Sequence, residues 1–385
     1  MKVVYTAPNR SHHYPYAAAL ASRGALGAFV SGFPRFGKQA AIDLPAGALK
    51  RRDGVQLLYL AALRTPFLRQ RPAEWLAYLS KCYLDRASIR WAREADIILA
   101  YNGCALASFT ALQGSRTRRV LEVVNSHVSC QDELLAEEHD RCGLPYKGVF
   151  PAEKRRRLQE YDICDHILCP SSFVARSLIA RGIPQTKIIK NGYGFRRIPT
   201  DGRPPVERNG TRLLYVGSVS VRKGLRYLIK ALGQVKQPGV TLDIVGPMTG
   251  VTGLENMTLP ASVKFHGVLK AAELGAMFAQ SDVFVLPSIE EGQALVIGEA
   301  LGFGLPIIAT ENTGADDVIT DGREGFIVPI RDAQALAEKI DRLLGNDDLR
   351  RTMAAAATQT ARFLGGWDVA GNRLVDRLQT LLKTP

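Results

Sequence analysis

The sequence predicts an α/β protein made of two doubly wound parallel sheets that face each other across a cleft. Short β-rich runs alternate with amphipathic patterns along the whole chain, as in parallel sheets with helices on both faces. The 385 residues are 46% hydrophobic and 23% charged, an ordinary globular composition of a length that suits two domains. A polar stretch rich in glycine and proline, residues 191–210, interrupts the alternation.

In the first half the expected strands are short apolar runs at Lys2–Thr6, Ala28–Ser31, Asp96–Ala100, Arg119–Val124, His166–Cys169 and Lys187–Lys190. Helical patterns occupy Ala73–Glu94 and Ala152–Tyr161. In the second half the expected strands are Arg212–Val216, Thr241–Val245, Val263–Phe265, Val283–Leu286, Pro306–Ala309 and Gly325–Val328. The helical patterns there are Leu225–Val235, Ala272–Gln280, Ala294–Phe303 and Ala333–Leu344.

The stretch rich in glycine and proline is interpreted as the linker between the domains. We therefore expect a first domain over residues 1–195 and a second over residues 205–362. We expect the last helix, residues 366–385, to pack back on the first domain.

The net charge of +13 is concentrated in the first half of the chain. Residues 1–200 hold 30 Lys and Arg against 16 Asp and Glu, whereas residues 201–385 hold 20 against 21. This asymmetry indicates an anionic partner for the first half, although a solvated basic surface explains it equally well.

Among anionic partners, a membrane surface is favoured over nucleic acid. Residues 55–92 mix arginines with an interfacial set of apolar side chains, namely Leu57, Leu58, Tyr59, Leu60, Phe67, Leu68, Trp75, Leu76 and Trp91. No helix-turn-helix, zinc-finger or RNP-type motif is present, so no nucleic-acid partner is expected.

The six cysteines show no paired spacing and are interpreted as free thiols. A zinc site from Cys130, His139 and Cys142 is the alternative, which lacks a second ligand pair. The sequence contains no apolar run of about 18 residues, and its first residues are too short and too polar for a signal peptide. The expected location is cytoplasmic, or peripheral on the inner face of the membrane.

The strongest motif runs from Ser281 to Thr310, where a strand ends in a loop and a helix follows. The loop carries Glu291, and the helix carries Glu299. Backbone N–H groups of residues 292–295 lie at the start of this helix, a position that favours a pyrophosphate. A carboxylate at Glu299 can accept two vicinal hydroxyls, as a ribose presents them.

A second motif runs from Leu213 to Gly224, where a strand ends in a glycine turn and Arg222 and Lys223 precede a helix. Two cations at this point can neutralise a departing diphosphate, the task that a metal would otherwise perform. Taken alone, such a pair is more often a solvated helix start. No Asp-x-Asp motif lies in a suitable loop, so neither a metal nor any other cofactor is expected.

These segments resemble the retaining glycosyltransferases of family four, the group 1 glycosyltransferases with two Rossmann-like domains and the GT-B fold. The resemblance rests on two glutamates separated by seven residues, on the basic pair before a glycine, and on the strand–Gly–hydrophobic turn at residues 263–269. It covers about residues 160–345. It implies a first domain on the acceptor side and a second domain that binds a nucleotide-sugar.

The resemblance also implies roles for individual residues. Glu291 would bond hydroxyls of the donor sugar and Glu299 the ribose, while Arg222 and Lys223 hold the diphosphate. The donor-binding candidates are Gly217, Ser218, Val268, Leu269, Gly292, Gln293, Ala294, Leu295 and Glu299. The family usually has Phe-Gly where this chain has Gln293-Ala294, a departure that bears on the donor sugar.

The first half matches the family less well. Its first loop is usually rich in glycine, but here it carries Asn9, His12 and His13, the acceptor-side candidates. Bulky polar residues block the close backbone approach that glycine permits. His127 follows a strand end and is expected to point into the cleft, near the donor sugar, as a catalytic candidate.

The expected function is that of a retaining, metal-independent glycosyltransferase, with a UDP- or GDP-sugar donor and a glycan or lipid-linked acceptor of envelope polysaccharide synthesis. The resemblance implies a same-face mechanism, in which the departing phosphate helps to deprotonate the acceptor hydroxyl. One alternative is a sugar-nucleotide epimerase or hydrolase, which needs acid/base carboxylates where this chain has Asn9, His12 and His13. Another is a non-catalytic, membrane-associated nucleotide-sugar-binding protein.

Overall fold

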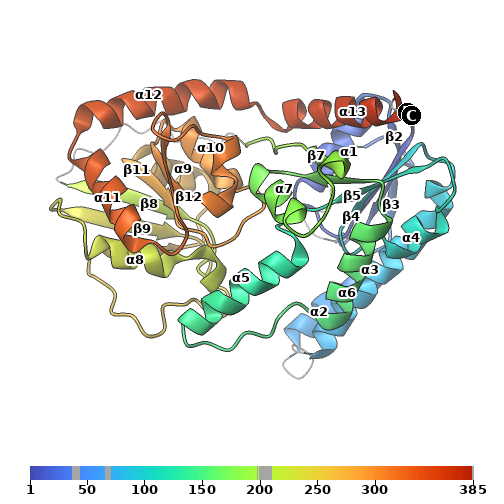
Figure 1. Cartoon of the computed structure of the whole chain (residues 1–385), viewed down its shortest axis with the longest axis horizontal. Coiled ribbons are helices and arrows are strands. Elements are labelled where there is room, and N and C mark those ends of the chain that lie inside the picture. The colour runs from blue at the N-terminus through green and yellow to red at the C-terminus, as the bar shows by residue number, and fades with distance from the viewer. Residues whose placement is uncertain (37–43, 66–70, 197, 199–209, 384–385) are drawn as a thin grey trace.

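The computed structural model describes residues 1–36, 44–65, 71–196, 198 and 210–383. Two parallel sheets lie side by side in it, each with helices on both faces (Figure 1). The first has seven strands in the order β3-β2-β1-β4-β5-β6-β7, and the second has six in the order β10-β9-β8-β11-β12-β13. The predicted class, two doubly wound α/β units, is confirmed.

The strands of the first sheet are β1 (Val3–Ala7), β2 (Leu26–Ser31), β3 (Leu49–Arg51), β4 (Ile97–Tyr101), β5 (Arg118–Glu122), β6 (His166–Cys169) and β7 (Ile188–Lys190). Those of the second are β8 (Thr211–Val216), β9 (Val240–Val245), β10 (Val263–Gly267), β11 (Val283–Leu286), β12 (Ile307–Thr310) and β13 (Gly325–Val328). Every predicted strand is present. Only β3 was not predicted, because its three residues form a half-buried edge strand with two basic side chains.

The helices are α1 (His13–Ser22), α2 (Gly54–Arg64), α3 (Arg71–Ala92), α4 (Leu106–Ala111), α5 (Val128–Arg141), α6 (Pro151–Ile163), α7 (Ser172–Ile179), α8 (Leu225–Leu232), α9 (Ala271–Ala279), α10 (Leu295–Gly302), α11 (Ala333–Leu344), α12 (Asp347–Leu364) and α13 (Trp367–Lys383). The short 3-10 turn η3 (Val221–Lys223) precedes α8. In the described chain, no helix is long and apolar enough to cross a bilayer.

Each sheet has a switch point, where strand order reverses and the following loops diverge. In the first sheet it lies between β1 and β4, and in the second between β8 and β11. Parallel strands end at one edge, so the loops after these four strands are the places where a ligand is expected. Both basic residues of the second motif and both histidines of the first loop follow such strands.

The last helix joins the two halves of the molecule. After α12 crosses the second sheet's helices, α13 lies against α1 of the first half (Figure 1). Apolar side chains of α13 enter the same core as β1 and α1, among them Leu374 and Leu378. A methyl group on Gly371 would lie 2.3 Å from the Cβ of Ala19, so glycine permits this close helix contact.

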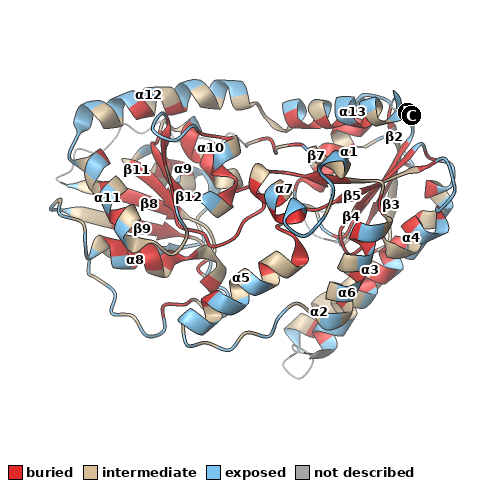
Figure 2. Cartoon of the chain, viewed as in Figure 1, coloured by how far each residue is buried: buried red, intermediate tan, exposed pale blue. Residues whose placement is uncertain are grey.

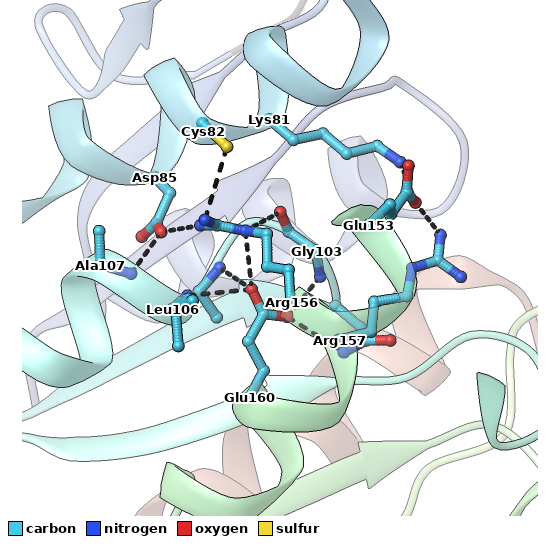
Figure 3. Close-up of polar contacts among 12 residues, drawn as sticks. Lys81, Cys82, Asp85, Gly103, Leu106, Ala107, Glu153, Arg156, Arg157 and Glu160 are labelled. Atoms are coloured by element: carbon cyan, nitrogen blue, oxygen red, sulfur yellow. Dashed lines mark hydrogen bonds and ion pairs between the residues drawn. The ribbon is translucent and has the colours of Figure 1, made fainter. Parts of the chain in front are cut away.

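A buried charge network connects α3, α4 and α6 (Figure 3). Glu160 of α6 accepts hydrogen bonds from the backbone N–H groups of Gly103, Ala105 and Leu106 at 2.5, 2.8 and 2.9 Å. Asp85 of α3 accepts two more at the start of α4, and Arg156 pairs with both carboxylates. Together these two carboxylates satisfy the orphan N–H groups at the α4 N-terminus.

Helices α2 and α3 form a hairpin with exposed positions along it (Figure 2). Leu58 of α2 and Trp75, Leu79 and Tyr83 of α3 are 60%, 50%, 45% and 44% exposed. Phe67 and Leu68, which belong to the predicted interfacial set, lie outside the described residues.

Candidate donor site and the facing loop of the first domain

The two loops at the switch point of the second sheet are locked together. The backbone N–H of Ile289, after β11, donates to the carbonyl of Arg222, after β8, at 2.9 Å. Gly224 adopts a φ of +62°, and a methyl group there would lie 2.1 Å from the carbonyl oxygen of Pro287. A glycine is therefore required at this position, and it sets the basic pair directly beside the glutamate loop.

Glu291 occupies the centre of this site. Its side chain is 8% exposed and is paired with Lys223 and with Arg222, whose guanidinium donates at 2.9 Å. Ser288 donates a further hydrogen bond at 3.1 Å. Burial alone would raise the pKa of Glu291, but Lys223 and Arg222 outweigh it and hold that pKa below its usual range. The carboxylate is therefore ionised at neutral pH.

The neighbouring Glu290, for which the sequence suggested no separate role, connects the two halves of the molecule. Its buried carboxylate accepts from the backbone N–H and hydroxyl of Ser126, at 2.9 and 2.8 Å, and from the amide of Gln131 at 3.0 Å. Ser126 and Gln131 belong to the first domain, at and beyond the start of α5. Glu290 also pairs with Arg222 at 3.4 Å, so it connects the basic pair to the first domain, whereas Glu291 pairs with the basic residues of its own half.

Gly292 makes the closest backbone approach between the halves. A methyl group on it would lie 1.6 Å from the carbonyl oxygen of Val124, after β5. The hydroxyl of Ser171, before α7, donates to the Gly292 carbonyl at 2.5 Å. The loop after β11, residues 287–294, is therefore held directly against the first domain at this point.

The Gln293-Ala294 departure has a structural explanation. The amide oxygen of Gln293 accepts from the backbone N–H of Tyr193 at 2.6 Å, so this side chain binds the connection between the two sheets. The N–H of Ala294 donates to the carbonyl of Thr313 at 3.0 Å. This N–H is engaged by another loop of the second half, and the donor-binding role of Ala294 stays a prediction. Leu295, the first residue of α10, packs against the core of the first domain.

Glu299 lines a different cavity from Glu291. That cavity, of about 830 Å³, lies between α10, α12 and the start of α13, and Arg196 also lines it. Burial raises the pKa of Glu299, and Arg196 opposes the shift. Glu291 lines a smaller cavity, of about 180 Å³. The assignment of Glu299 to a ribose stays a prediction.

The other donor candidates lie on loops at the same edge of the sheet. Gly217 and Ser218 follow β8, and the Ser218 carbonyl accepts from the hydroxyl of Tyr215 at 2.8 Å. Val268, after β10, is 75% exposed, whereas Leu269 packs partly against the core. Val268 is thus available to a nucleobase, and its role there remains a prediction.

The first-domain loop faces Glu291 across the small cavity. Asn9, His12 and His13 all line that cavity together with Glu291. Both histidines pair with the buried Glu122: His12 Nε2 lies 2.8 Å from one carboxylate oxygen, and His13 Nδ1 lies 3.1 Å from the other. The hydroxyl of Tyr5 also donates to Glu122, at 2.8 Å.

Sequence reasoning missed Glu122, although a charged residue at the end of a buried strand was the available signal. Burial raises its pKa, but the two histidines outweigh burial and hold the pKa of Glu122 below its usual range. Burial lowers the pKa of His13 to about 4, which keeps that ring neutral at physiological pH.

His127 is held by contacts within the first domain. It caps α5 through Nδ1, which accepts from the backbone N–H of Ser129 at 3.2 Å. Its ring stacks on Tyr161 with a centroid separation of 4.7 Å, and burial lowers its pKa to about 4. These contacts direct the ring toward the core of the first domain, and its expected role beside the donor sugar remains a prediction.

Helix α5 carries several acidic side chains, of which Glu138 is buried while Glu133 and Glu137 are exposed. Glu138 is fully buried and, with Glu137, pairs with Arg331 of the second half at 2.8 and 2.7 Å. Asp132 pairs with Lys154 at 2.5 Å. Glu137 and Glu138 thus connect the two halves, whereas Asp132 pairs within the first domain.

The six cysteines are free, as expected. Cys130, His139 and Cys142 do not form one of the metal-ligand clusters of the described chain; His12, His13 and Glu122 do, with one ligand atom each lying within 4.8 Å of the others. The His12–Glu122 separation of 2.8 Å is that of a direct hydrogen bond.

Residues 210–346 match a family model described as "Glycosyl transferases group 1". A putative colanic acid biosynthesis glycosyltransferase WcaL of Salmonella typhimurium is 27% identical over 238 residues, 56% of this chain and 57% of that protein. A GDP-mannose-dependent alpha-mannosyltransferase of Mycobacterium tuberculosis is 28% identical over 225 residues, 57% of each. The matches span little more than half the length of these relatives.

Among solved structures, Alr3699/HepE of Anabaena in complex with UDP matches 99% of this chain and 100% of that chain, with a TM-score of 0.67 at 18% identity. The fold is therefore GT-B, as predicted. In sequence, residues 210–346 are similar to the group 1 glycosyltransferases.

Proposed function

We propose that this protein is a retaining, metal-independent glycosyltransferase that moves a sugar from a nucleoside-diphosphate sugar to a glycan or lipid-linked acceptor. The observation that carries the proposal is the buried Glu291 carboxylate between Arg222 and Lys223 at the switch point of the second sheet. Two cations and a carboxylate at this point match the needs of a donor, which brings a diphosphate and a sugar.

The chemistry follows from an exchange of partners. When the donor binds, its diphosphate takes Arg222 and Lys223 from Glu291, and the freed carboxylate accepts hydroxyls of the sugar. As the bond between the anomeric carbon and the phosphate oxygen breaks, the two cations stabilise the negative charge on the diphosphate. The acceptor oxygen attacks from the same face, and its proton passes to the departing phosphate. The described residues thus supply the charge that a metal would provide.

The relatives support a nucleoside-diphosphate sugar as the donor, but they do not identify its nucleobase. One relative is named for GDP-mannose, and one structural neighbour holds UDP. Either nucleotide therefore belongs in the first donor screen. The relative named for colanic acid supports an acceptor in envelope polysaccharide synthesis.

The test is release of nucleoside diphosphate from a panel of UDP- and GDP-sugars, in EDTA, with and without glycan acceptors. The proposal expects release that survives EDTA and collapses in Lys223→Ala and Glu299→Ala. Full activity of both variants would contradict the site assignment. Turnover without any acceptor would instead indicate an epimerase or hydrolase, and binding without turnover a non-catalytic protein.

We also propose that the α2–α3 hairpin rests on an anionic membrane surface at the cytoplasmic face. Trp75, Leu79 and Tyr83 lie on one stripe of α3, because they are four residues apart, and the exposed Arg86 and Arg90 continue that stripe. Aromatic and aliphatic side chains followed by arginines suit a headgroup boundary.

Co-sedimentation with phosphatidylglycerol vesicles tests this partner. We expect binding at low salt that weakens in the Trp75→Ser/Leu79→Ser double variant. Phe363→Ser, which removes a 79% exposed phenylalanine from α12, is the matched control and should bind as the wild type does. Equal binding of all three proteins, or none at low salt, would contradict the proposal.

A further inference from the structure

Helix α5 of the first domain is docked on the second domain. Its fully buried Glu138 pairs with Arg331 at 2.8 Å and accepts from the hydroxyl of Tyr227 at 3.2 Å. Arg331 has a φ of +65°, an uncommon conformation for a residue other than glycine, and its side chain also donates to the carbonyl of Leu134 at 3.1 Å. The helix packs against η3, the turn that carries the basic pair. The position of the first domain is therefore linked to that of the basic pair.

The carboxylate of Glu290 receives partners from both halves of the molecule. One oxygen, Oε1, accepts from the backbone N–H and the hydroxyl of Ser126. The other, Oε2, accepts from the amide of Gln131 at 3.0 Å, and the Nε of Arg222 lies 3.4 Å from the same atom. That Nε donates to the backbone carbonyl of Glu290, at 2.9 Å. Gln131 and Arg222 are thus alternative donors to one oxygen, and in the docked structure Gln131 makes the hydrogen bond.

The neutral donors of the first domain leave Arg222 available to a ligand. Glu290 is fully buried, and a buried carboxylate needs hydrogen-bond partners, of which Ser126 and Gln131 supply three. The side chain of Arg222 is 32% exposed, so the guanidinium is the partner that can move. Its Nη2 donates to Glu291 at 2.9 Å, on the side where the diphosphate is proposed to bind. Without the three neutral donors, Glu290 would take the adjacent Arg222 as its full partner and draw the guanidinium away.

We propose that Glu290 is a positioning residue for Arg222, and that docking of α5 on Glu290 makes the guanidinium available to the diphosphate. In the docked arrangement, Ser126 and Gln131 satisfy Glu290, and Arg222 faces the donor. In the undocked arrangement, Glu290 competes with the diphosphate for Arg222. This inference rests on the proposed function and adds to it a role of the first domain in holding the donor, exerted through Glu290 without contact to the nucleotide.

The experiment is a double-mutant cycle on diphosphate affinity. Calorimetric titration of UDP and GDP is carried out on the full chain as wild type, Gln131→Leu, Glu290→Gln and the double variant. Gln131→Leu removes the neutral donor and keeps a side chain of similar size. Gln159→Leu, which changes an exposed glutamine of α6, is the matched control.

We expect Gln131→Leu to weaken the affinity for the nucleotide by about tenfold, the effect of one lost charge-assisted contact, and Gln159→Leu to have no effect. In the Glu290→Gln background, the same Gln131→Leu substitution should change the affinity by less than about twofold, because no carboxylate remains to capture Arg222. A coupling of this kind between two residues that do not contact the nucleotide is not expected from a structural role alone.

Turnover gives a second readout. Glu290→Gln should leave the affinity for UDP or GDP near that of the wild type and lower kcat for nucleoside diphosphate release by about tenfold, because Arg222 loses an orienting contact. A carboxylate with a structural role alone would lower the urea midpoint and leave kcat of the folded protein unchanged.

Three results would overturn the inference. These are an unchanged affinity in Gln131→Leu, an equal loss in both backgrounds, or an unchanged kcat in Glu290→Gln. A wild type that binds neither nucleotide would contradict the proposed function itself, and this inference with it. Should Gln131→Leu fold poorly, Ser126→Ala decides in its place: it removes one hydroxyl, keeps the backbone donor, and should weaken the affinity by about threefold only when Glu290 is present.

Discussion

Two clusters in this protein each pair buried carboxylates with basic groups, and they differ in what completes them. In the network of Asp85, Arg156 and Glu160, backbone N–H groups at the start of α4 satisfy the carboxylates, and each of the three side chains is at most 7% exposed (Figure 3). In the donor cluster, Arg222 and Lys223 are 32% and 18% exposed and share one carboxylate, Glu291.

The difference separates structure from function. A fully satisfied buried network fixes one local structure and has no capacity for a ligand. A cluster with part-exposed cations at a switch point can exchange its internal carboxylate for the phosphates of a donor. Composition alone therefore does not identify a site, because the hydrogen bonds that complete each cluster decide its role.

The largest effect is expected in the structural network. Arg156→Ala leaves two buried carboxylates without their cation and should lower the free energy of unfolding by about 3–5 kcal/mol. Urea denaturation followed by circular dichroism measures it, with the exposed Arg351→Ala as control. Donor affinity of the folded fraction should not change. A loss below about 1 kcal/mol would mean that the two clusters do not differ in this way.

In the donor cluster, we expect a substitution to lower turnover and to leave stability nearly unchanged. Lys223→Ala removes one of two groups that stabilise the leaving diphosphate and should lower kcat by about 10²–10³-fold, with the urea midpoint nearly unchanged. Steady-state kinetics of nucleoside diphosphate release measure it. Lys236→Ala, on an exposed turn after α8, is the matched control. A large loss of stability with normal turnover would show that Lys223 has a structural role and not a role in turnover.

A smaller effect on stability is expected at Gln293, where the loop after β11 contacts the connection between the two sheets. Gln293→Ala leaves the Tyr193 N–H without its acceptor and should cost about 1–3 kcal/mol of stability. Gln293→Glu keeps an acceptor in place and should retain most of the stability. Thermal unfolding of both variants is the measurement, and an equal loss in the two would show that the hydrogen bond is not the cause.

The smallest effect concerns His127, which belongs with the structural groups. The folded protein keeps this ring neutral down to a pKa of about 4, whereas the unfolded chain takes up its proton near 6.5. The unfolded state therefore binds more protons between these values, and stability falls as pH drops from 6.5 to 4. His127→Asn, which retains an N-cap residue, should reduce this slope. An identical slope in the variant, measured by urea denaturation at several pH values, would show that the ring does not titrate this way.

Much of the fold could be predicted from the sequence because both sheets consist of parallel strands whose apolar runs stand out from the amphipathic helices. Strand β3 could not, since three residues with basic side chains lack such a pattern. The two donor motifs could also be identified from the sequence, because their glycines and charged residues directly follow the strands predicted there. These local patterns showed which residues gather there but not which cavity each one lines.

Hydrogen bonds between residues far apart in the sequence could not be predicted from it. Glu122 stands 110 residues from His12, and Glu290 stands 164 residues from Ser126, so neither pairing leaves a local pattern. The Ala294 N–H looked free because its acceptor, Thr313, lies on another loop. Side chains that satisfy one another across the domain boundary become visible only when both sheets are in place.

Calorimetric titration of UDP and GDP in EDTA measures whether Arg222 and Lys223 hold a diphosphate without a metal. We predict that the wild type binds at least one of the two nucleotides and that Lys236→Ala binds it equally well. Lys223→Ala should weaken that affinity at least tenfold. Unchanged affinity in Lys223→Ala, or binding only when a divalent metal is supplied, would contradict a metal-independent diphosphate site at Arg222 and Lys223.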